Sequence, residues 1–119
     1  MIAHLVLFTP KPELSAEDRR ATVLALERAC VDIPEIRRAQ VGRRRVLGYA
    51  YDALAPAHFE YAVLLEFDSE SDLRTYLHHP AHVALGHHFN NSAAAALALD
   101  FTIGDPSQIR AIAGLDSAG

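Results

Sequence analysis

The chain has 119 residues, of which half are hydrophobic and 22% are charged, and its formal net charge is −4. This length fits one domain, and the composition is that of an ordinary globular protein that can bury a core without disulfides or metals. The negative charge argues against a nucleic acid or an anionic membrane as a partner.

The single cysteine excludes an internal disulfide and fits a reducing compartment. The sequence contains no apolar run near the length of a membrane helix. It begins with a strand-like run that lacks the basic start and the cleavage site of a signal peptide. We therefore expect a cytoplasmic protein, with Cys30 as an inert core residue.

The first two predicted elements are a strand and a helix. Residues 2–9 are almost continuously apolar, interrupted by His4, which favours a strand covered on both faces. Ser15 with Asp18 three residues later predicts the start of a helix that ends at Pro34. Apolar side chains at three- and four-residue spacing predict the buried face of this helix: Val23, Leu26, Cys30 and Ile33.

The middle of the chain predicts two further strands. Residues 36–51 mix apolar side chains with five arginines, which we interpret as a partly exposed edge strand with a bulge at Gly42. The arginines protect such an edge, or alternatively form a phosphate or carboxylate site. Residues 53–58 are predicted to be a loop. Alternation along residues 59–67 predicts the second strong strand.

A proline joint is the most distinctive feature of the remaining sequence, and it lies in the segment Tyr76-Leu77-His78-His79-Pro80-Ala81-His82. Ser69 starts a helix that Pro80 should stop near His78, and the same proline is suited to begin the next helix. That second helix should reach about residue 95, with Val83, Gly86 and Phe89 on its apolar side. Residues 97–103 then alternate as a final strand.

The order of these elements predicts an α+β fold. It is the ferredoxin-like βαββαβ arrangement, a four-stranded antiparallel sheet with helices on one face, over residues 1–104. A tail at 105–119 follows, and it is either loosely held or packs as an arm on a neighbour. The first and third strands are apolar on both faces, and no spare element covers the second face. We therefore expect a homodimer in which two sheets pack face to face, a dimeric α+β barrel.

Several short motifs support a family assignment. They are His4-Leu5-Val6-Leu7-Phe8, Ile33-Pro34, Val41-Gly42, Phe67-Asp68-Ser69, Leu73, Tyr76, His79-Pro80-Ala81-His82 and Asp100-Phe101. In these the chain resembles the stress-responsive A/B barrel family over residues 1–104. The resemblance implies a dimeric barrel with a pocket between sheet and helices.

The resemblance also implies candidate site residues. Olivetolic acid cyclase, a plant member of the family, closes a linear polyketide thioester by aldol condensation without a metal or organic cofactor. Its catalytic tyrosine and histidine correspond to Tyr76 and His82, and a pocket histidine corresponds to His4. A further pocket histidine corresponds to Tyr61, and this departure argues against the same substrate.

The chemistry of these residue types agrees with such roles. Neutral His82 can take a proton from a carbon acid beside a carbonyl, and a nearby helix N-terminus disfavours its protonated form. Tyr76 can donate a hydrogen bond to the oxygen that gains charge. In the structural alternative, Tyr76 packs in the helix stripe, His82 pins the joint, and His4 is a hydrogen-bonded core residue.

A metal site is the less favoured interpretation of the histidines. His78 and His82 are four residues apart, but Pro80 breaks the helix that would place them on one face. No acidic ligand lies in the cluster, and His87 and His88 are expected at the surface. We predict no metal and no cofactor, although exposed histidines can bind metals adventitiously.

Three functions remain open. The first is a cofactor-free cyclase or lyase that acts on a carbonyl or polyketide-like small molecule through His82 and Tyr76. The second is a non-catalytic dimer that binds a small hydrophobic ligand or serves a stress response, and Tyr61 in place of histidine favours it slightly. The third, by analogy of fold alone, is a cofactor-free monooxygenase.

Overall fold

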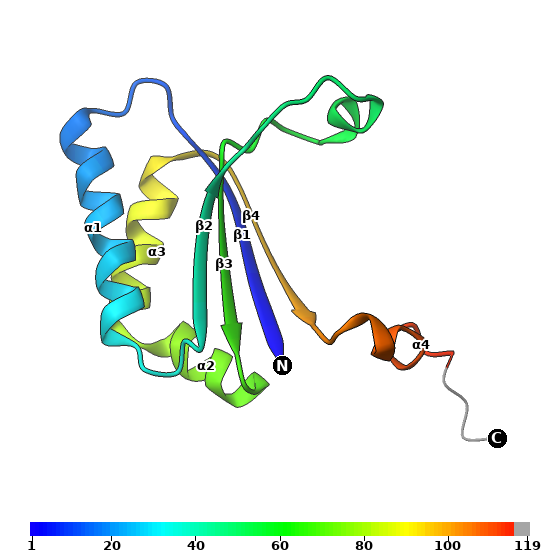
Figure 1. The fold of residues 1–119 in the computed structure, drawn as a ribbon. Helices are drawn as coiled ribbons and strands as arrows, with labels where there is room; N and C mark the ends of the chain where they lie inside the picture. Colours follow the sequence, from blue (N-terminus) through cyan, green and yellow to red (C-terminus); the bar gives the residue numbers. More distant parts are fainter. Residues whose placement is uncertain (116–119) are drawn as a thin grey trace.

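The computed structural model describes residues 1–115 as one antiparallel sheet covered by helices on one face (Figure 1). The strand order is β2-β3-β1-β4, which confirms the predicted ferredoxin-like arrangement. No helix within residues 1–115 is long and apolar enough to cross a membrane. The elements are β1 (Ile2–Pro10), α1 (Ala16–Asp32), β2 (Arg38–Arg43), β3 (Tyr61–Phe67), α2 (Glu70–His78), α3 (Pro80–Ser92), β4 (Ala93–Thr102) and α4 (Ile109–Ile112), with 3₁₀ turns η1 (Ala50–Leu54) and η2 (Pro106–Gln108).

Both predicted helix starts are confirmed. The Ser15 hydroxyl accepts a hydrogen bond from the backbone N–H of Asp18, at 3.1 Å, and caps α1. The Ser69 hydroxyl accepts one from the N–H of Asp72, also at 3.1 Å, and caps α2. In each case a serine oxygen satisfies a donor that the first helical turn leaves unpaired.

The proline joint also forms as predicted. Helix α2 ends at His78, and Pro80 occupies the first turn of α3. His79 lies between the two helices, and its Nδ1 accepts a hydrogen bond from the N–H of Ala81 at 3.0 Å. A proline at this position loses no helical hydrogen bond, and the histidine supplies the cap, so the chain turns sharply between the helices.

The core lies between the sheet and the helices. In β3 the alternation is regular, and Val63, Leu65 and Phe67 are all buried. Ile33, at the end of α1, and Leu73, in α2, complete this layer. The largest fully buried side chains are Phe67, Ile33 and Leu65.

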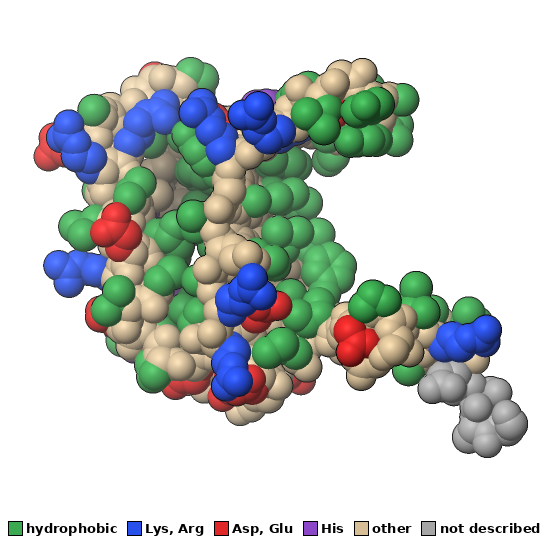
Figure 2. All heavy atoms as spheres, in the orientation of Figure 1, with side chains coloured by type: hydrophobic (Ala, Val, Ile, Leu, Met, Phe, Trp, Pro, Cys, Tyr) green, Lys and Arg blue, Asp and Glu red, His purple; other side chains and the backbone are tan. Residues whose placement is uncertain are grey.

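Nothing within residues 1–115 covers the second face of the sheet. In the β1–β4 register Leu5 lies opposite Leu99 and Leu7 opposite Leu97, and these side chains point away from the helices. Leu97, Leu99 and Phe101 are exposed. Figure 2 shows hydrophobic side chains along this hollowed side of the molecule.

Two expectations about the edge strand were wrong. Strand β2 covers only Arg38–Arg43, not residues 36–51, and all six residues are exposed. Gly42 pairs in register with Ala62, so it forms no bulge. Beyond β2, Gly48 has a φ of 87°, the left-handed conformation that glycine adopts without strain. Residues 53–58 were predicted as a loop; their first two residues belong to the 3₁₀ turn η1 (Ala50–Leu54), and residues 55–58 follow it as irregular chain.

The helical faces also differ from the predicted ones. Val23 and Val83 are exposed, whereas Ala25, Ala29 and Leu85 are buried. Helices α1 and α3 pack side by side and are linked by a 3.3 Å contact between the Thr22 and Ser92 hydroxyls. Hydrophobic spacing favours the larger Val23 as a core residue, whereas the buried positions of α1 are the small residues Ala25 and Ala29.

Two segments project from the body. One connects β2 to β3 and contains η1, and the other follows β4 and contains η2 and α4 (Figure 1). The second is the described part of the predicted tail, and residues 116–119 lie outside the described residues.

Candidate functional site

Three of the predicted site residues meet at one place. Tyr76, on α2, is only 2% exposed. Its ring centroid lies 4.6 Å from that of His82, on α3, and 5.7 Å from that of His4, on β1. Two helices and a strand therefore converge on the tyrosine, and the joint at Pro80 brings His82 back beside it.

A backbone contact determines the tautomer of His82. Its Nδ1 lies 2.9 Å from the carbonyl oxygen of Leu77. A carbonyl oxygen only accepts hydrogen bonds, so Nδ1 carries the proton and Nε2 retains the lone pair. Burial lowers the pKa of His82, and His4 and His78 lower it further, against the opposing effect of the Leu77 hydrogen bond. The ring is therefore held neutral, with Nε2 available as a base.

His4 is paired with an aspartate from the neighbouring strand. Its Nδ1 lies 2.5 Å from Oδ1 of Asp100, which is its partner residue in the β1–β4 register. We did not predict Asp100 as a site residue, although it belongs to one of the matching motifs. The signal was present in the sequence, because a lone carboxylate alternates with Leu99 and Phe101 in an apolar strand.

The environment of Tyr76 keeps its hydroxyl protonated. Burial raises the pKa of this tyrosine well above its usual value, and the neighbouring Cys30 thiol adds to the rise. Burial also raises the pKa of Cys30 itself. The ring packs against Phe67, with centroids 5.2 Å apart. Tyr76 is therefore a hydrogen-bond donor rather than a base.

Tyr61 lies apart from this cluster. It lines a largely apolar cavity of about 250 Å³ between the sheet, α1 and α3, together with Phe8, Leu26 and Phe89. The Arg43 guanidinium lies over its ring, 5.9 Å from the centroid. None of His4, Tyr76 and His82 lines this cavity.

A second hollow, of about 240 Å³, lies beside the cluster. Leu77 and Asp100 line it, and these are the residues that hold His82 and His4. Glu70, Arg74 and Thr102 give it a more polar wall than the first cavity has. None of His4, Tyr76 and His82 lines this hollow either.

The remaining histidines do not assemble a metal site within residues 1–115, where no group of three potential ligands converges. His78 and His87 are exposed, and His79 caps α3. The cluster His4–Tyr76–His82 is suited to proton transfer and oxyanion binding, which the neutral imidazole and the protonated phenol provide.

A family model matches most of the chain. The model of the stress responsive A/B barrel domain matches residues 2–103. The chain belongs to this family. No curated protein matches the sequence.

Solved structures share the fold of this family member. A dimeric ferredoxin-like protein of unknown function from Thermobifida fusca is 26% identical, covers 86% of this chain and 90% of its own, and has a TM-score of 0.66. A hydroxynitrile lyase from Passiflora edulis is 20% identical, with 87% and 94% covered and a TM-score of 0.72. SnoaB, a cofactor-independent oxygenase from Streptomyces nogalater, is 12% identical, with 87% and 93% covered and a TM-score of 0.62.

Proposed function

We propose that the protein is a cofactor-free enzyme of the cyclase or lyase type, in which His82 acts as general base on a carbonyl or polyketide-like small molecule. One observation carries this proposal: the Leu77 carbonyl holds the Nδ1 proton of His82, while the ring lies 4.6 Å from that of Tyr76. A fixed neutral imidazole beside a protonated phenol is the pair that enolate chemistry requires.

In the proposed reaction, Nε2 of His82 takes a proton from the carbon beside a carbonyl group. The electron pair of the broken C–H bond moves to the carbonyl oxygen, where the Tyr76 hydroxyl donates a hydrogen bond to the developing charge. The enolate carbon then attacks a second carbonyl of the same molecule and forms the ring bond. The proton held by His82 returns to the resulting alkoxide, so the cycle needs no cofactor.

His4 and Tyr61 have binding roles in this proposal. The Asp100 carboxylate fixes the tautomer of His4, so the opposite nitrogen of that ring can accept a hydrogen bond from the substrate. Tyr61 contacts an apolar part of the molecule in the 250 Å³ cavity. Phe89 of that cavity and His82 lie on the same helix, about 10 Å apart along its axis.

The proposed enzyme works as a homodimer, joined through the open sheet face. The apolar residues on that face, Leu97, Leu99 and Phe101, support this proposal. The Thermobifida fusca protein is described as dimeric. The lyase and the oxygenase with this fold support enzymatic chemistry by analogy.

The direct test is turnover. We would incubate the protein, with a metal chelator present, with linear polyketide thioesters, β-diketones and hydroxynitriles, and follow products by mass spectrometry. The proposal expects a cyclised or cleaved product at a rate above the buffer blank. Binding of these compounds without any product would contradict it.

The pH dependence of turnover gives a second test. Since burial lowers the pKa of His82 below its usual 6.5, the base remains neutral in mildly acidic solution. The ratio kcat/KM should therefore stay level as the pH falls past 6.5 and should decrease only as the pH passes through the lower pKa of the folded protein. A pH–rate profile measures the midpoint of the decrease in kcat/KM, and an NMR titration of the His82 ring measures its pKa. A midpoint at or above 6.5 would count against His82 as the base.

The cavity favours a second candidate function, the binding of a small hydrophobic ligand without turnover. The 250 Å³ cavity is lined mainly by apolar side chains and does not contain the histidine–tyrosine cluster. Leu26→Trp, which fills the cavity from α1, should weaken binding of an apolar fluorescent probe at least tenfold. Leu24→Trp, at an exposed position of the same helix, is the matched control. Equal affinities for the two variants would exclude this cavity as the binding site.

A further inference from the structure

We propose that the two projecting segments are arms that clasp a second copy of this chain. Residues 44–58 form the first arm, and residues 104–115 form the C-terminal arm. The inference rests on the proposed homodimer and extends it, because it assigns the partner's contact surface to segments outside the sheet.

The shape of the chain is the first argument. Its radius of gyration is 16.4 Å, whereas a compact chain of this length has about 13.5 Å. Figure 1 shows both arms on the side of the sheet that faces away from the helices, one at each end of the sheet. The two arms therefore border the uncovered face of the sheet at its two ends.

The first arm is apolar although it is surrounded by solvent. Its exposed large side chains are Val46, Leu47, Tyr49, Tyr51 and Leu54, the last 82% exposed. Between residues 46 and 57 the only charged residue is Asp52, and its carboxylate accepts hydrogen bonds from the N–H groups of Gly48, at 2.8 Å, and Tyr49, at 3.1 Å. Surface connections are normally rich in polar side chains that water solvates, so this composition indicates a contact surface.

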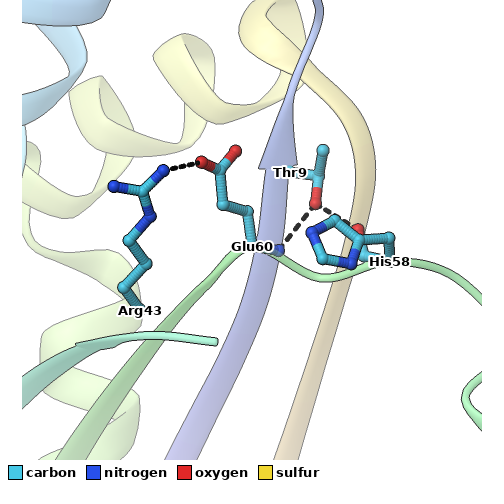
Figure 3. A network of polar contacts seen from close by, with 4 residues as sticks. All are labelled: Thr9, Arg43, His58 and Glu60. Atoms are coloured by element: carbon cyan, nitrogen blue, oxygen red, sulfur yellow. Dashed lines mark hydrogen bonds and ion pairs between the residues drawn. The ribbon is translucent and has the colours of Figure 1, made fainter. Parts of the chain in front are cut away.

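The base of the first arm is fixed to the body. Figure 3 shows that the Thr9 side chain contacts both His58 and Glu60. The Thr9 hydroxyl donates a hydrogen bond to the His58 carbonyl and accepts one from the N–H of Glu60, the second at 2.8 Å. Arg43 forms a 3.0 Å ion pair with Glu60. On the other side the N–H of Arg44 donates to the Glu60 carbonyl, at 2.7 Å. The arm is therefore held outward before any partner arrives.

The C-terminal arm has the same character. The N–H of Ile103 donates to the Met1 carbonyl, at 3.0 Å, which fixes the point where the arm leaves the sheet. Asp105 caps the 3₁₀ turn through the N–H of Ser107, at 2.9 Å. Beyond this turn Ile109, Ile112 and Leu115 are all exposed. Their exposed apolar side chains again indicate a partner.

A second copy of the chain is the occupant that fits best. The two arms and β4 together carry eleven of the seventeen exposed large hydrophobic side chains within residues 1–115. An isologous interface uses the same patch on both copies, so arms that border an apolar face can each cover the arm or face of the other copy. The Thermobifida fusca protein of the same fold is described as dimeric.

Sedimentation equilibrium from nanomolar to micromolar concentration tests the inference. The variant Y49S/Y51S/L54S should raise the dissociation constant of the dimer at least tenfold, and so should removal of residues 105–119. The matched control L24S/V31S/V83S changes three exposed apolar residues on the helices and should leave the constant within twofold. A photo-crosslinker at position 51, in a mixture of ¹⁵N-labelled and unlabelled protein, should give mixed-isotope crosslinks to the other copy.

The outcomes separate this inference from the proposed dimer. If the arm variants keep the wild-type constant while L99D/F101D becomes monomeric, the sheet interface stands and the arms do not clasp. If L99D/F101D also remains dimeric, the sheet interface itself is wrong. Wild-type protein that is monomeric at micromolar concentration would overturn both the sheet dimer and the clasping arms. Dissociation of the arm variants, together with mixed-isotope crosslinks from position 51, would support both the dimer and the arms.

Discussion

His82→Gln is expected to lower kcat on any substrate that the protein turns over by about 10²–10⁴-fold, the usual contribution of a positioned general base. Glutamine is similar in length and can still donate a hydrogen bond to the Leu77 carbonyl, which His82 contacts at 2.9 Å. It cannot accept a proton at neutral pH. The change therefore removes the proposed chemistry and leaves the joint between α2 and α3 in place.

His87→Gln is the matched control for this prediction, since it makes the same change at an exposed position of the same helix. Its kcat should remain within twofold of wild type. Steady-state kinetics of wild type, His82→Gln and His87→Gln measure kcat, and circular dichroism verifies the fold of each protein. If His82→Gln and His87→Gln have the same kcat, His82 is not the base and the binding function becomes the better proposal.

Phe67→Ala is expected to lower the free energy of unfolding by about 3–5 kcal/mol, the usual cost of removing a buried phenylalanine. Phe67 is completely buried on β3, at the centre of the core. Its ring lies 5.2 Å from that of Tyr76, so its loss also removes the support of the candidate site. The total free energy of unfolding of a domain of this size is about 5–15 kcal/mol, so the folded state of the variant should be only marginally stable.

Urea unfolding at one fixed protein concentration measures this effect, because the stability of a dimer depends on concentration. Val31→Ala, at a helical position that is 81% exposed, is the control and should change the free energy by about 0.5 kcal/mol or less. A loss below about 1 kcal/mol for Phe67→Ala would mean that the core described here is not the one that stabilises the protein.

Local features of the chain were predictable because they depend on neighbours in the sequence. Ser15 and Ser69 cap the helices that follow them, and Pro80 separates α2 from α3 where it was expected to. The alternation of Val63, Leu65 and Phe67 identified the strand that the structure contains. Each of these signals acts within a few residues, through a side chain that satisfies or removes a backbone donor or through a period of two.

The failures involve residues whose role depends on a distant partner. Gly42 was predicted to form a bulge, but it pairs regularly with Ala62. Val23 has the spacing of a core residue, yet the close packing of α1 on α3 favours Ala25 and Ala29 and leaves the valine outside. Hydrophobic spacing predicts which residues can be buried. It does not predict which face of a helix packs closely against another helix.

The order of the elements and the joint at Pro80 could be predicted from the amino-acid sequence, and so could the family that implies Tyr76 and His82 as a pair. The fold was needed to find that His4 contacts Asp100, that Tyr61 lines a separate cavity, and that two apolar arms border the open face. The reason is the separation along the chain: His4 and Asp100 are 96 positions apart, and strand register alone brings them together. Motifs and periodicity describe neighbours in sequence, whereas a site and an interface consist of neighbours in space.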